Sequence, residues 1–248
     1  MKYQALFSLI ESSKKIVVFG GAGTSTESNV PDFRSENGLY SMQEYGVSPE
    51  EILSHQYFYT HPDRFYDFLK KHLMLSNIKP HKGHHALVYL ESHGLNTIIT
   101  QNIDGLHQAA GSKNVLELHG SLDRHFCINC HSGYDADWIR QTPAGSIKCP
   151  KCGGLVKPDV VLYGESLDQD IMSQSVKALS EADLLIVAGT SLVVYPASSF
   201  IRFYRGKNLV LINKSETPYD RNASHIIRDS FGEVFSEIQS AFEAQSSK

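Results

Sequence analysis

All four cysteines of the chain lie in one short stretch, as the pairs Cys127-x-x-Cys130 and Cys149-x-x-Cys152 with 18 residues between them. This spacing is typical of a zinc ribbon, in which four thiolates hold one tetrahedral ion. Because sulfur fills all four positions, none remains for an activated water, and we expect one structural Zn²⁺ ion. The alternative, a thioredoxin-like redox pair, needs only one C-x-x-C and a different fold around it.

The 248 residues, 41% of them apolar, suffice for one sizeable core or for a large domain that carries a small one. The chain has 27 acidic and 23 basic residues and no long run of either sign, so bulk charge predicts no binding to nucleic acid or to an anionic membrane. Residues 1–21 predict an amphipathic helix and a buried strand, not a signal peptide or a membrane span. Clustered thiols without a secretion signal favour the reducing cytoplasm.

Short apolar runs rich in Val, Ile and Leu predict the buried strands of a parallel sheet. These runs cover residues 16–19, 97–100, 184–188 and 209–212. Helical patterns lie between them, at residues 84–92 and 171–182. The alternation predicts an α/β fold with a Rossmann-like doubly wound parallel sheet, which binds its ligand at the carboxyl ends of the strands.

Two stretches do not fit this alternation and are interpreted as insertions that form a smaller lobe. Residues 39–82 are rich in aromatic residues and histidine and are predicted to be helical, and residues 122–156 contain the cysteines. The larger lobe of a single domain spanning residues 1–248 then comprises about residues 1–38, 83–121 and 157–248. A cleft between two lobes is a common place for a ligand.

A glycine-rich loop, GGAGTS at residues 20–25, directly follows the first predicted strand. Its glycines let the backbone approach a pyrophosphate, and the next helix can offer its N-terminal N–H groups, so phosphate binding is the first hypothesis. The third glycine of the dinucleotide fingerprint is missing, since Thr26 stands there, and a tight strand-to-helix turn is the alternative. Downstream, Pro31, Phe33 and Arg34 can cover a nicotinamide ring and a ribose or phosphate, or form a proline turn with a buried Phe and a surface Arg.

Polar side chains follow the second predicted strand, in the segment TQNIDGLH at residues 100–107. They should emerge at the carboxyl edge of the sheet, where polar groups are candidates for ligand contact. Asp104 can accept a hydrogen bond from a carboxamide, and Gln101 and Asn102 can bind hydroxyls or an ordered water. The alternative is an Asx turn in which Asp104 caps the following helix.

His119 stands at the end of another apolar run, just before the insertion that contains the cysteines. An imidazole with a pKa of about 6.5 can take a proton from a ribose hydroxyl near neutral pH. The chain has 12 histidines, and the strand-end position distinguishes His119 from others such as His84 and His85. His119 is therefore the candidate general base.

Seven co-linear motifs across nearly the whole chain resemble the sirtuin family of NAD-dependent protein deacylases, in its bacterial form. They are GAGTSTESNVPDFRS, TQNIDGLH, ELHGS, the two C-x-x-C pairs, KPDVVLYGE, GTSLVVYP and INKSETP. The resemblance rests on the whole set in the family's order and spacing, since no single motif carries it. It implies one sirtuin-type catalytic domain that uses NAD as co-substrate and removes acetyl or other acyl groups from protein lysines.

The resemblance also implies roles for individual residues. His119 matches the general base, and Asn102 is the second residue given a catalytic role. Cofactor contacts are implied for Gly21, Ala22, Gly23, Thr26, Phe33, Arg34, Gln101, Asn102, Ile103, Asp104, His119, Gly189, Thr190, Ser191, Asn213, Lys214, Glu216 and Ser230. An extended substrate peptide would add as a strand between two edges, formed by Val160, Val161, Tyr163, Gly164, Glu165, Val193 and Val194. A β-rich connection that starts at Pro158 is the alternative interpretation of the first edge.

By this resemblance, the acyl group passes to ADP-ribose and nicotinamide is released, so the expected partners are acylated proteins or peptides. We expect binding neither to nucleic acid nor to a membrane. We expect a cytoplasmic monomer. Two alternatives share the motifs: mono-ADP-ribosyl transfer to a protein, and a non-catalytic module that binds NAD or ADP-ribose. Intact Asn102, Asp104 and His119 argue against the module, and a hydride-transferring dehydrogenase has the least support.

Two positions depart from the family pattern. Asn29 stands where the family usually has Gly, which is tolerable because Asn also adopts left-handed backbone conformations. Leu69 stands where desuccinylating members have the Arg of a Tyr-x-x-Arg motif that begins here at Tyr66. Because Leu69 cannot pair with a carboxylate, we expect acetyl or longer apolar acyl groups unless Lys70 takes that role.

Overall fold

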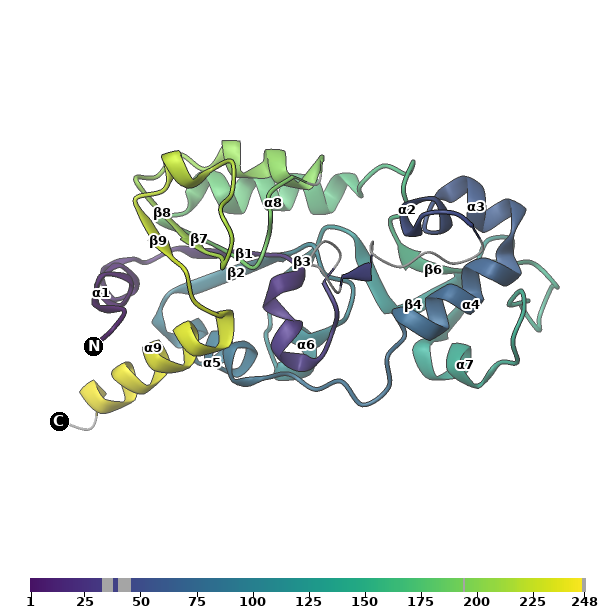
Figure 1. The fold of residues 1–248 in the computed structure, drawn as a ribbon, viewed down its shortest axis with the longest axis horizontal. Coiled ribbons are helices and arrows are strands. Elements are labelled where there is room, and N and C mark those ends of the chain that lie inside the picture. Colours follow the sequence, from purple (N-terminus) through teal and green to yellow (C-terminus); the bar gives the residue numbers. More distant parts are fainter. Residues whose placement is uncertain (33–37, 40–45, 194, 247–248) are drawn as a thin grey trace.

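The computed structural model describes residues 1–32, 38–39, 46–193 and 195–246. Among these residues, six parallel strands form a large sheet (Figure 1). Across the sheet the order is β3-β2-β1-β7-β8-β9. The strands are β1 (Ile16–Gly20), β2 (Leu95–Thr100), β3 (Val115–Glu117), β7 (Leu184–Ala188), β8 (Asn208–Ile212) and β9 (His225–Ile227). From β1 the chain adds β2 and then β3 on one side of the sheet, and it then crosses over to add β7 on the other side of β1. The predicted doubly wound sheet is confirmed, and its switch point lies between β1 and β7.

Both faces of this sheet are covered, which explains why its central strands β1 and β7 are buried at every position. Ile16 and Val18 of β1 point into one core with α1, α5 and α9, whereas Val17 and Phe19 point into the other with α8 and η5. The bounds are α1 (Gln4–Ser12), α5 (Lys82–Leu90), α6 (Leu106–Ala110), α8 (Gln169–Glu181), η5 (Ala197–Phe203) and α9 (Phe231–Ser246). No helix in the described part of the chain is long and apolar enough to cross a membrane.

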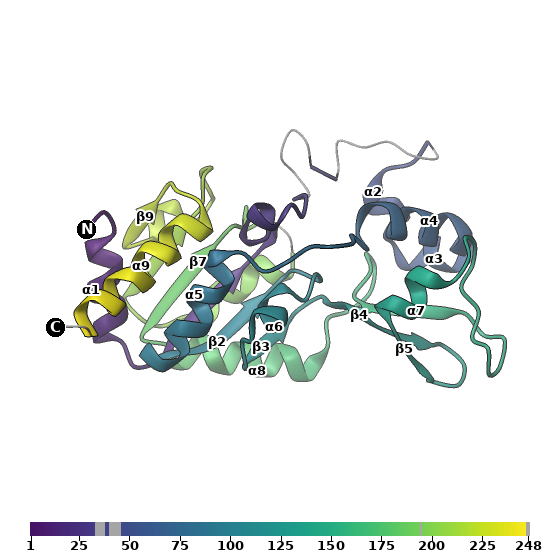
Figure 2. The same ribbon diagram turned by 90° about the horizontal axis from the view of Figure 1, so that it is seen from below.

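A second, three-stranded antiparallel sheet and four short helices form a small lobe at the end of the molecule opposite the termini (Figure 2). Phe58, Phe65 and Tyr66 share one core with Cys127 and Cys149, so the helical segment and the cysteine-containing segment pack as a unit. The strands, in the order β5-β4-β6, are β4 (Gly120–Cys127), β5 (Gly133–Asp135) and β6 (Val156–Val160). The helices are α2 (Pro49–Ile52), α3 (His55–Thr60), α4 (Pro62–His72) and α7 (Ala136–Gln141).

The glycine-rich loop leads into two 3-10 turns, η1 (Ala22–Thr24) and η2 (Thr26–Ser28), instead of the expected helix. The second turn ends at Asn29, which has a left-handed backbone with φ 61°. Pro31 follows two residues later and disfavours a helical conformation at the residue before it. Asparagine adopts the left-handed conformation more readily than most residues, so it serves here in place of glycine.

Three histidines are buried inside the protein: His84 in α5, His107 in α6 and His125 in β4 are each at most 2% exposed. Among the described residues, Nε2 of His84 and both ring nitrogens of His107 and His125 have no hydrogen-bond partner. Burial without partners disfavours the charged ring. It lowers the pKa of His84 to about 2 and those of His107 and His125 to about 4.

These lowered pKa values predict that the free energy of unfolding decreases as the pH falls below about 6.5. Above that pH the stability is fully present, because the rings are neutral in the folded and in the unfolded chain. Below it only the unfolded chain binds the protons, until the folded pKa near 4 or lower is reached. Each histidine then removes about 1.4 kcal/mol per pH unit.

Urea unfolding at a series of pH values between 7 and 5 measures this slope. His107→Gln removes one of the titrating groups and should flatten the slope. His85→Gln, at an exposed position of the same helix as His84, should leave it unchanged. Equal slopes in the three proteins would contradict the prediction.

Candidate active site and zinc site

The loops after β1 and β7 touch each other at the switch point of the large sheet. Gly23 N–H donates to the carbonyl oxygen of Gly189 at 2.8 Å, and Gly21 N–H donates to that of Ala188 at 3.1 Å. A Cβ atom on Gly21 would lie 2.7 Å from Cβ of Thr190, and one on Gly23 would lie 2.7 Å from Cα of Gly189. The glycines of the loop are therefore needed for close packing of the two loops, besides any contact with a phosphate.

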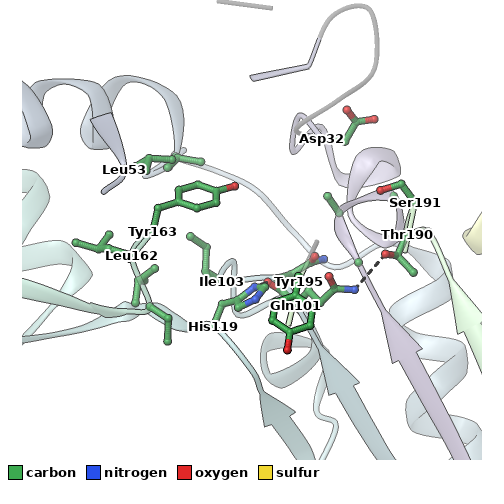
Figure 3. A pocket seen from close by; sticks show the side chains of 18 of the residues that line it. Asp32, Leu53, Gln101, Ile103, His119, Leu162, Tyr163, Thr190, Ser191 and Tyr195 are labelled. Carbon is green, nitrogen blue, oxygen red and sulfur yellow. Dashed lines mark hydrogen bonds between the residues drawn. The ribbon is translucent and has the colours of Figure 1, made fainter. Parts of the chain in front are cut away.

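A cavity of about 420 Å³ lies between these loops and the small lobe (Figure 3). Its large-lobe side carries the residues predicted to contact the cofactor, namely Gly21, Ala22, Gly23, Gln101, Asn102, Ile103, His119, Gly189, Thr190, Ser191, Asn213 and Glu216. The residues predicted for the first peptide edge also line it, namely Val160, Val161, Tyr163, Gly164 and Glu165. Side chains from distant parts of the sequence thus meet in one space.

His119 reaches this cavity from the end of β3, and one of its ring nitrogens is already in use. Nδ1 lies 2.8 Å from the carbonyl oxygen of Gln101. Because a carbonyl only accepts, the neutral ring must carry its proton on Nδ1, which leaves the lone pair on Nε2. Burial lowers the pKa of His119 below 6.5, and the hydrogen bond to Gln101 opposes that shift in part. His119 is therefore neutral at pH 7 and able to accept a proton.

The carboxamide of Asn102 is buried and faces the glycine-rich loop. Its Nδ2 donates to Oγ1 of Thr24 at 3.1 Å and to Oγ of Ser25 at 3.0 Å. Nε2 of Gln101 donates to Oγ1 of Thr190 at 3.1 Å, as Figure 3 shows, and so joins the loop after β2 to the loop after β7. Sequence reasoning assigned no role to Thr24 and Ser25, although both stand in the quoted motif GAGTS.

Asp104 forms the Asx turn that was the alternative interpretation of its motif. Its Oδ1 accepts from the backbone N–H of Leu106, at the start of α6, at 3.0 Å. Burial raises the pKa of this carboxyl, and hydrogen bonds from Leu106 and Ser25 oppose the shift. Asp104 is not among the residues that line the cavity.

Several other predicted residues also lie outside the lining of the cavity. Thr26 donates to the carbonyl oxygen of Gly23, and Ser230 donates to Oε1 of Glu27 at 3.2 Å. Lys214 is exposed, and Val193 is 52% exposed beside the cavity-lining Tyr195. The predictions for Phe33, Arg34 and Val194 fall on residues outside the described part of the chain.

The segment predicted as the first peptide edge is held by bonds to both lobes. The N–H of Val161 donates to the carbonyl oxygen of His119, and that of Tyr163 donates to the carbonyl oxygen of Leu53. The carboxylate of Glu165 lies 3.0 Å from Nζ of Lys157, and it accepts from the N–H of Leu162 at 2.9 Å. The pKa of Glu165 is lowered, because these bonds and one from His55 outweigh its burial.

The small-lobe end of the cavity is apolar. Leu53, Leu69 and Leu73 line it together with Leu162, whereas Tyr66 is fully buried and donates to the carbonyl oxygen of Val156 at 2.7 Å. Lys70 donates to the carbonyl oxygen of Thr142 at 2.6 Å and does not line the cavity. Sequence reasoning missed Leu53 and Leu73, which directly follow α2 and α4, because an apolar residue at a helix end gives the same signal whether it faces a core or a cavity.

The four cysteines form a site that fits one zinc ion. All four Sγ atoms lie within 4.8 Å of one another, and the Cys127–Cys152 and Cys130–Cys149 pairs are 3.4 and 3.6 Å apart. Tetrahedral Zn–S bonds of about 2.3 Å place their sulfurs about 3.8 Å apart, close to these distances.

The two C-x-x-C pairs form matching turns. A left-handed residue follows each pair, His131 with φ 56° and Gly153 with φ 75°. Each of these residues donates its N–H to the carbonyl oxygen of the first cysteine of its pair, Cys127 or Cys149. The donor set is four sulfurs, as predicted, so the site suits a structural ion.

An NAD-dependent protein deacetylase of Clostridium acetobutylicum is 51% identical over 239 residues, which are 96% of this chain and 98% of the relative. A solved Sir2 structure with a deacetylated p53 peptide and 3′-O-acetyl ADP-ribose has a TM-score of 0.88 at 35% identity, covering 97% of this chain and 98% of that one. A Sir2 homologue in complex with NAD has a TM-score of 0.86 at 35% identity, covering 99% and 95%.

The model of the Sir2 family matches residues 21–196, from the glycine-rich loop to the proline after Tyr195. The match therefore includes the loops after β1, β2 and β7, the candidate base His119 and the four cysteines. Together with the relative at 51% identity, it establishes that this chain belongs to the Sir2 family, the sirtuins.

Proposed function

We propose that this protein is an NAD-dependent protein-lysine deacetylase, which transfers the acetyl group of an acetyl-lysine to ADP-ribose and releases nicotinamide. The position of His119 carries the proposal: its Nε2 is free to accept a proton in a cavity where polar loops meet an apolar wall. The names of the relatives support it, since one is a deacetylase and a solved neighbour holds a deacetylated peptide with an acetylated ADP-ribose.

NAD fits the polar side of the cavity by the chemistry of the groups there. Amides and hydroxyls suit ribose hydroxyls and phosphates, and the carboxylates of Asp32 and Glu216 can accept from ribose hydroxyls. The glycine-rich loop lets a pyrophosphate approach the backbone. The proposed contacts are Gly21, Ala22, Gly23, Gln101, Asn102, Ile103, Thr190, Ser191, Asn213 and Glu216.

Bound NAD supplies an electrophilic ribose carbon, which the carbonyl oxygen of the acetyl-lysine attacks as nicotinamide leaves. His119, held through Nδ1 by Gln101, then accepts the proton of a ribose hydroxyl at Nε2. Asn102 holds the glycine-rich loop in place through Thr24 and Ser25. The ribose oxygen then attacks the acyl carbon, and one water completes the release of the lysine amine and O-acetyl-ADP-ribose, while the apolar wall keeps other water from the reacting groups.

The peptide is proposed to lie along Val160, Val161 and residues 163–165, with Val193 on the other side. The bonds of Glu165 to Lys157 and Leu162 support this, because they give the first edge a fixed shape before a peptide arrives. Main-chain pairing of this kind requires little of the substrate's sequence.

The zinc ion is proposed to be structural. The protein is proposed to act as a monomer in the cytoplasm and not to bind nucleic acid. Both walls of the cavity come from one chain, which supports a monomer. Four thiols gathered for metal binding suit a reducing compartment, and a net charge of −4 gives no general attraction to nucleic acid.

Acetyl, succinyl and long-acyl lysine peptides with NAD, followed by mass spectrometry, test both the reaction and the acyl preference. We expect nicotinamide, deacylated peptide and O-acyl-ADP-ribose from the acetyl and apolar acyl peptides, and little turnover of the succinyl peptide. A modified protein in place of O-acyl-ADP-ribose would mean ADP-ribosyl transfer. Zero release of nicotinamide would mean a binding module.

Leu69→Arg should change this acyl preference. An Arg at the apolar end of the cavity can pair with a succinyl carboxylate, so desuccinylation should rise at least about tenfold while deacetylation falls. Leu69→Met keeps the volume and the apolar character and serves as the matched control. An unchanged ratio of the two kcat/KM values in Leu69→Arg would contradict this role of Leu69.

A further inference from the structure

The glycine-rich loop is held from behind by the segment that leads into α5. The side chain of His81 spans the gap: Nδ1 accepts from the backbone N–H of Gly83 at 3.0 Å, and Nε2 lies 2.8 Å from the carbonyl oxygen of Thr24. An N–H only donates and a carbonyl only accepts, so the ring must be neutral with its proton on Nε2. One imidazole therefore caps α5 and binds the loop at once.

Thr24 connects this bond to the cavity. It is fully buried, and its Oγ1 accepts from Asn102 and donates to the carbonyl oxygen of Gly21 at 2.8 Å. Its N–H donates to the same carbonyl oxygen at 2.9 Å. Gly21 and Asn102 both line the cavity, so a shift of Thr24 would move two proposed NAD contacts.

The surroundings of His81 fix its ring in this orientation. The ring packs edge-on against His84, with centroids 4.3 Å apart, and against Phe231 of α9 at 5.7 Å. A Cβ atom on Gly83 would lie 2.8 Å from Cε1 of His81, so a glycine is needed there. A second bond nearby, from Oγ of Ser28 to the carbonyl oxygen of Lys79 at 2.7 Å, ties the same two segments together.

We propose that His81 is a positioning residue for NAD binding, which acts by holding Thr24 and with it the glycine-rich loop in the shape that accepts the dinucleotide. This proposal rests on the proposed function. This role is separate from the capping of α5, because a shorter side chain that does not contact Thr24 could also cap the helix.

Two substitutions separate the two bonds of the ring. His81→Asn keeps an acceptor at the position of Nδ1, and Asn is among the best N-cap residues, but its side chain is too short to reach Thr24. His81→Gln places an amide N–H near the position of Nε2 and is a poor cap. The Asn variant therefore keeps the cap without the loop contact, and the Gln variant keeps the contact without the cap.

Calorimetric NAD binding, steady-state kinetics and thermal unfolding are measured on both variants and on His85→Asn, a matched control at an exposed position of α5. In His81→Asn we expect the Kd and KM for NAD to rise about 3- to 10-fold, the loss of about one hydrogen bond. The KM for peptide and the kcat at saturating NAD should stay near wild type, and the Tm should fall by only about 2–4 °C, the effect of one hydrogen bond. In His81→Gln the NAD affinity should recover while the Tm falls.

Wild-type affinity for NAD in His81→Asn would overturn the proposal. It would also be overturned if the affinities for NAD and for peptide fell equally, in parallel with the Tm. If the wild-type protein itself bound no NAD, the proposed function would fail and His81 would have no NAD site to position. The calorimetric measurement distinguishes these results because it requires no turnover.

Discussion

His119→Ala is expected to reduce deacetylation by a factor of about 10² to 10⁴, the usual contribution of a general base, while the Kd for NAD stays near wild type. The loss follows from Nε2 of His119, the proposed proton acceptor; Nδ1 is already bound to Gln101. Formation of O-acetyl-ADP-ribose measures the reaction, and calorimetry measures NAD binding. Retained NAD binding would show that His119 acts in the chemical step and not in the binding of NAD.

His119→Asn is the stricter version of this experiment. Its amide can still donate to the carbonyl oxygen of Gln101, so the loop keeps its hydrogen bond while the base is absent. We expect this variant to be as inactive as His119→Ala. Substantial turnover in either variant would exclude His119 as the base, and loss of NAD binding in parallel with turnover would indicate a structural role.

Removal of the zinc ion is expected to unfold the small lobe and to abolish deacetylation. Structural zinc in small domains contributes on the order of 10 kcal/mol or more to folding, and here two of its ligands, Cys127 and Cys149, lie inside the core of the lobe. Metal analysis should give one zinc per chain in the wild-type protein and less in Cys149→Ala. Thermal unfolding and activity should both collapse in that variant.

Ser132→Ala provides the control for the zinc experiment. Oγ of Ser132 lies 3.3 Å from Sγ of Cys130, so the substitution changes the surroundings of the site but leaves all four thiolates. It should keep one zinc ion and nearly all activity. A Cys149→Ala protein with wild-type Tm and activity would show that the ion is dispensable.

Most strands of the large sheet could be predicted from the sequence, because a strand buried on both faces leaves an apolar run that few other structures produce. The edge strand β9 (His225–Ile227) was not predicted, since two of its three residues are exposed. The run at residues 16–19 became β1 (Ile16–Gly20), and the run at residues 184–188 became β7 with the same bounds. The helix predicted at residues 84–92 begins two residues earlier, at Lys82, because His81 caps it. Histidine is not among the residues that signal a helix cap, so this start could not be predicted.

The residues that line the cavity could be predicted where a motif lies at a strand end, whereas contacts between distant segments could not. Gln101, Asn102 and His119 follow strands and line the cavity. The hydrogen bond from Ser230 to Glu27, more than 200 residues away in the sequence, was not predicted, and a cofactor contact of Ser230 stays a prediction. No local pattern indicates such a pair, just as none indicates that Leu73 faces the cavity and not a core.

Helix α4 connects the two sites of the protein. Leu69 lines the apolar end of the cavity, while Phe65 and Tyr66 pack in the core that contains Cys127 and Cys149. An acyl-lysine bound in the cavity as proposed and an ion on the sulfurs would therefore favour the same packing of one helix. Because such linkage is reciprocal, bound acyl peptide should slow the loss of zinc to a chelator, and zinc should strengthen the binding of peptide more than that of NAD. An ion without an open coordination position would then act as an allosteric effector of acyl recognition.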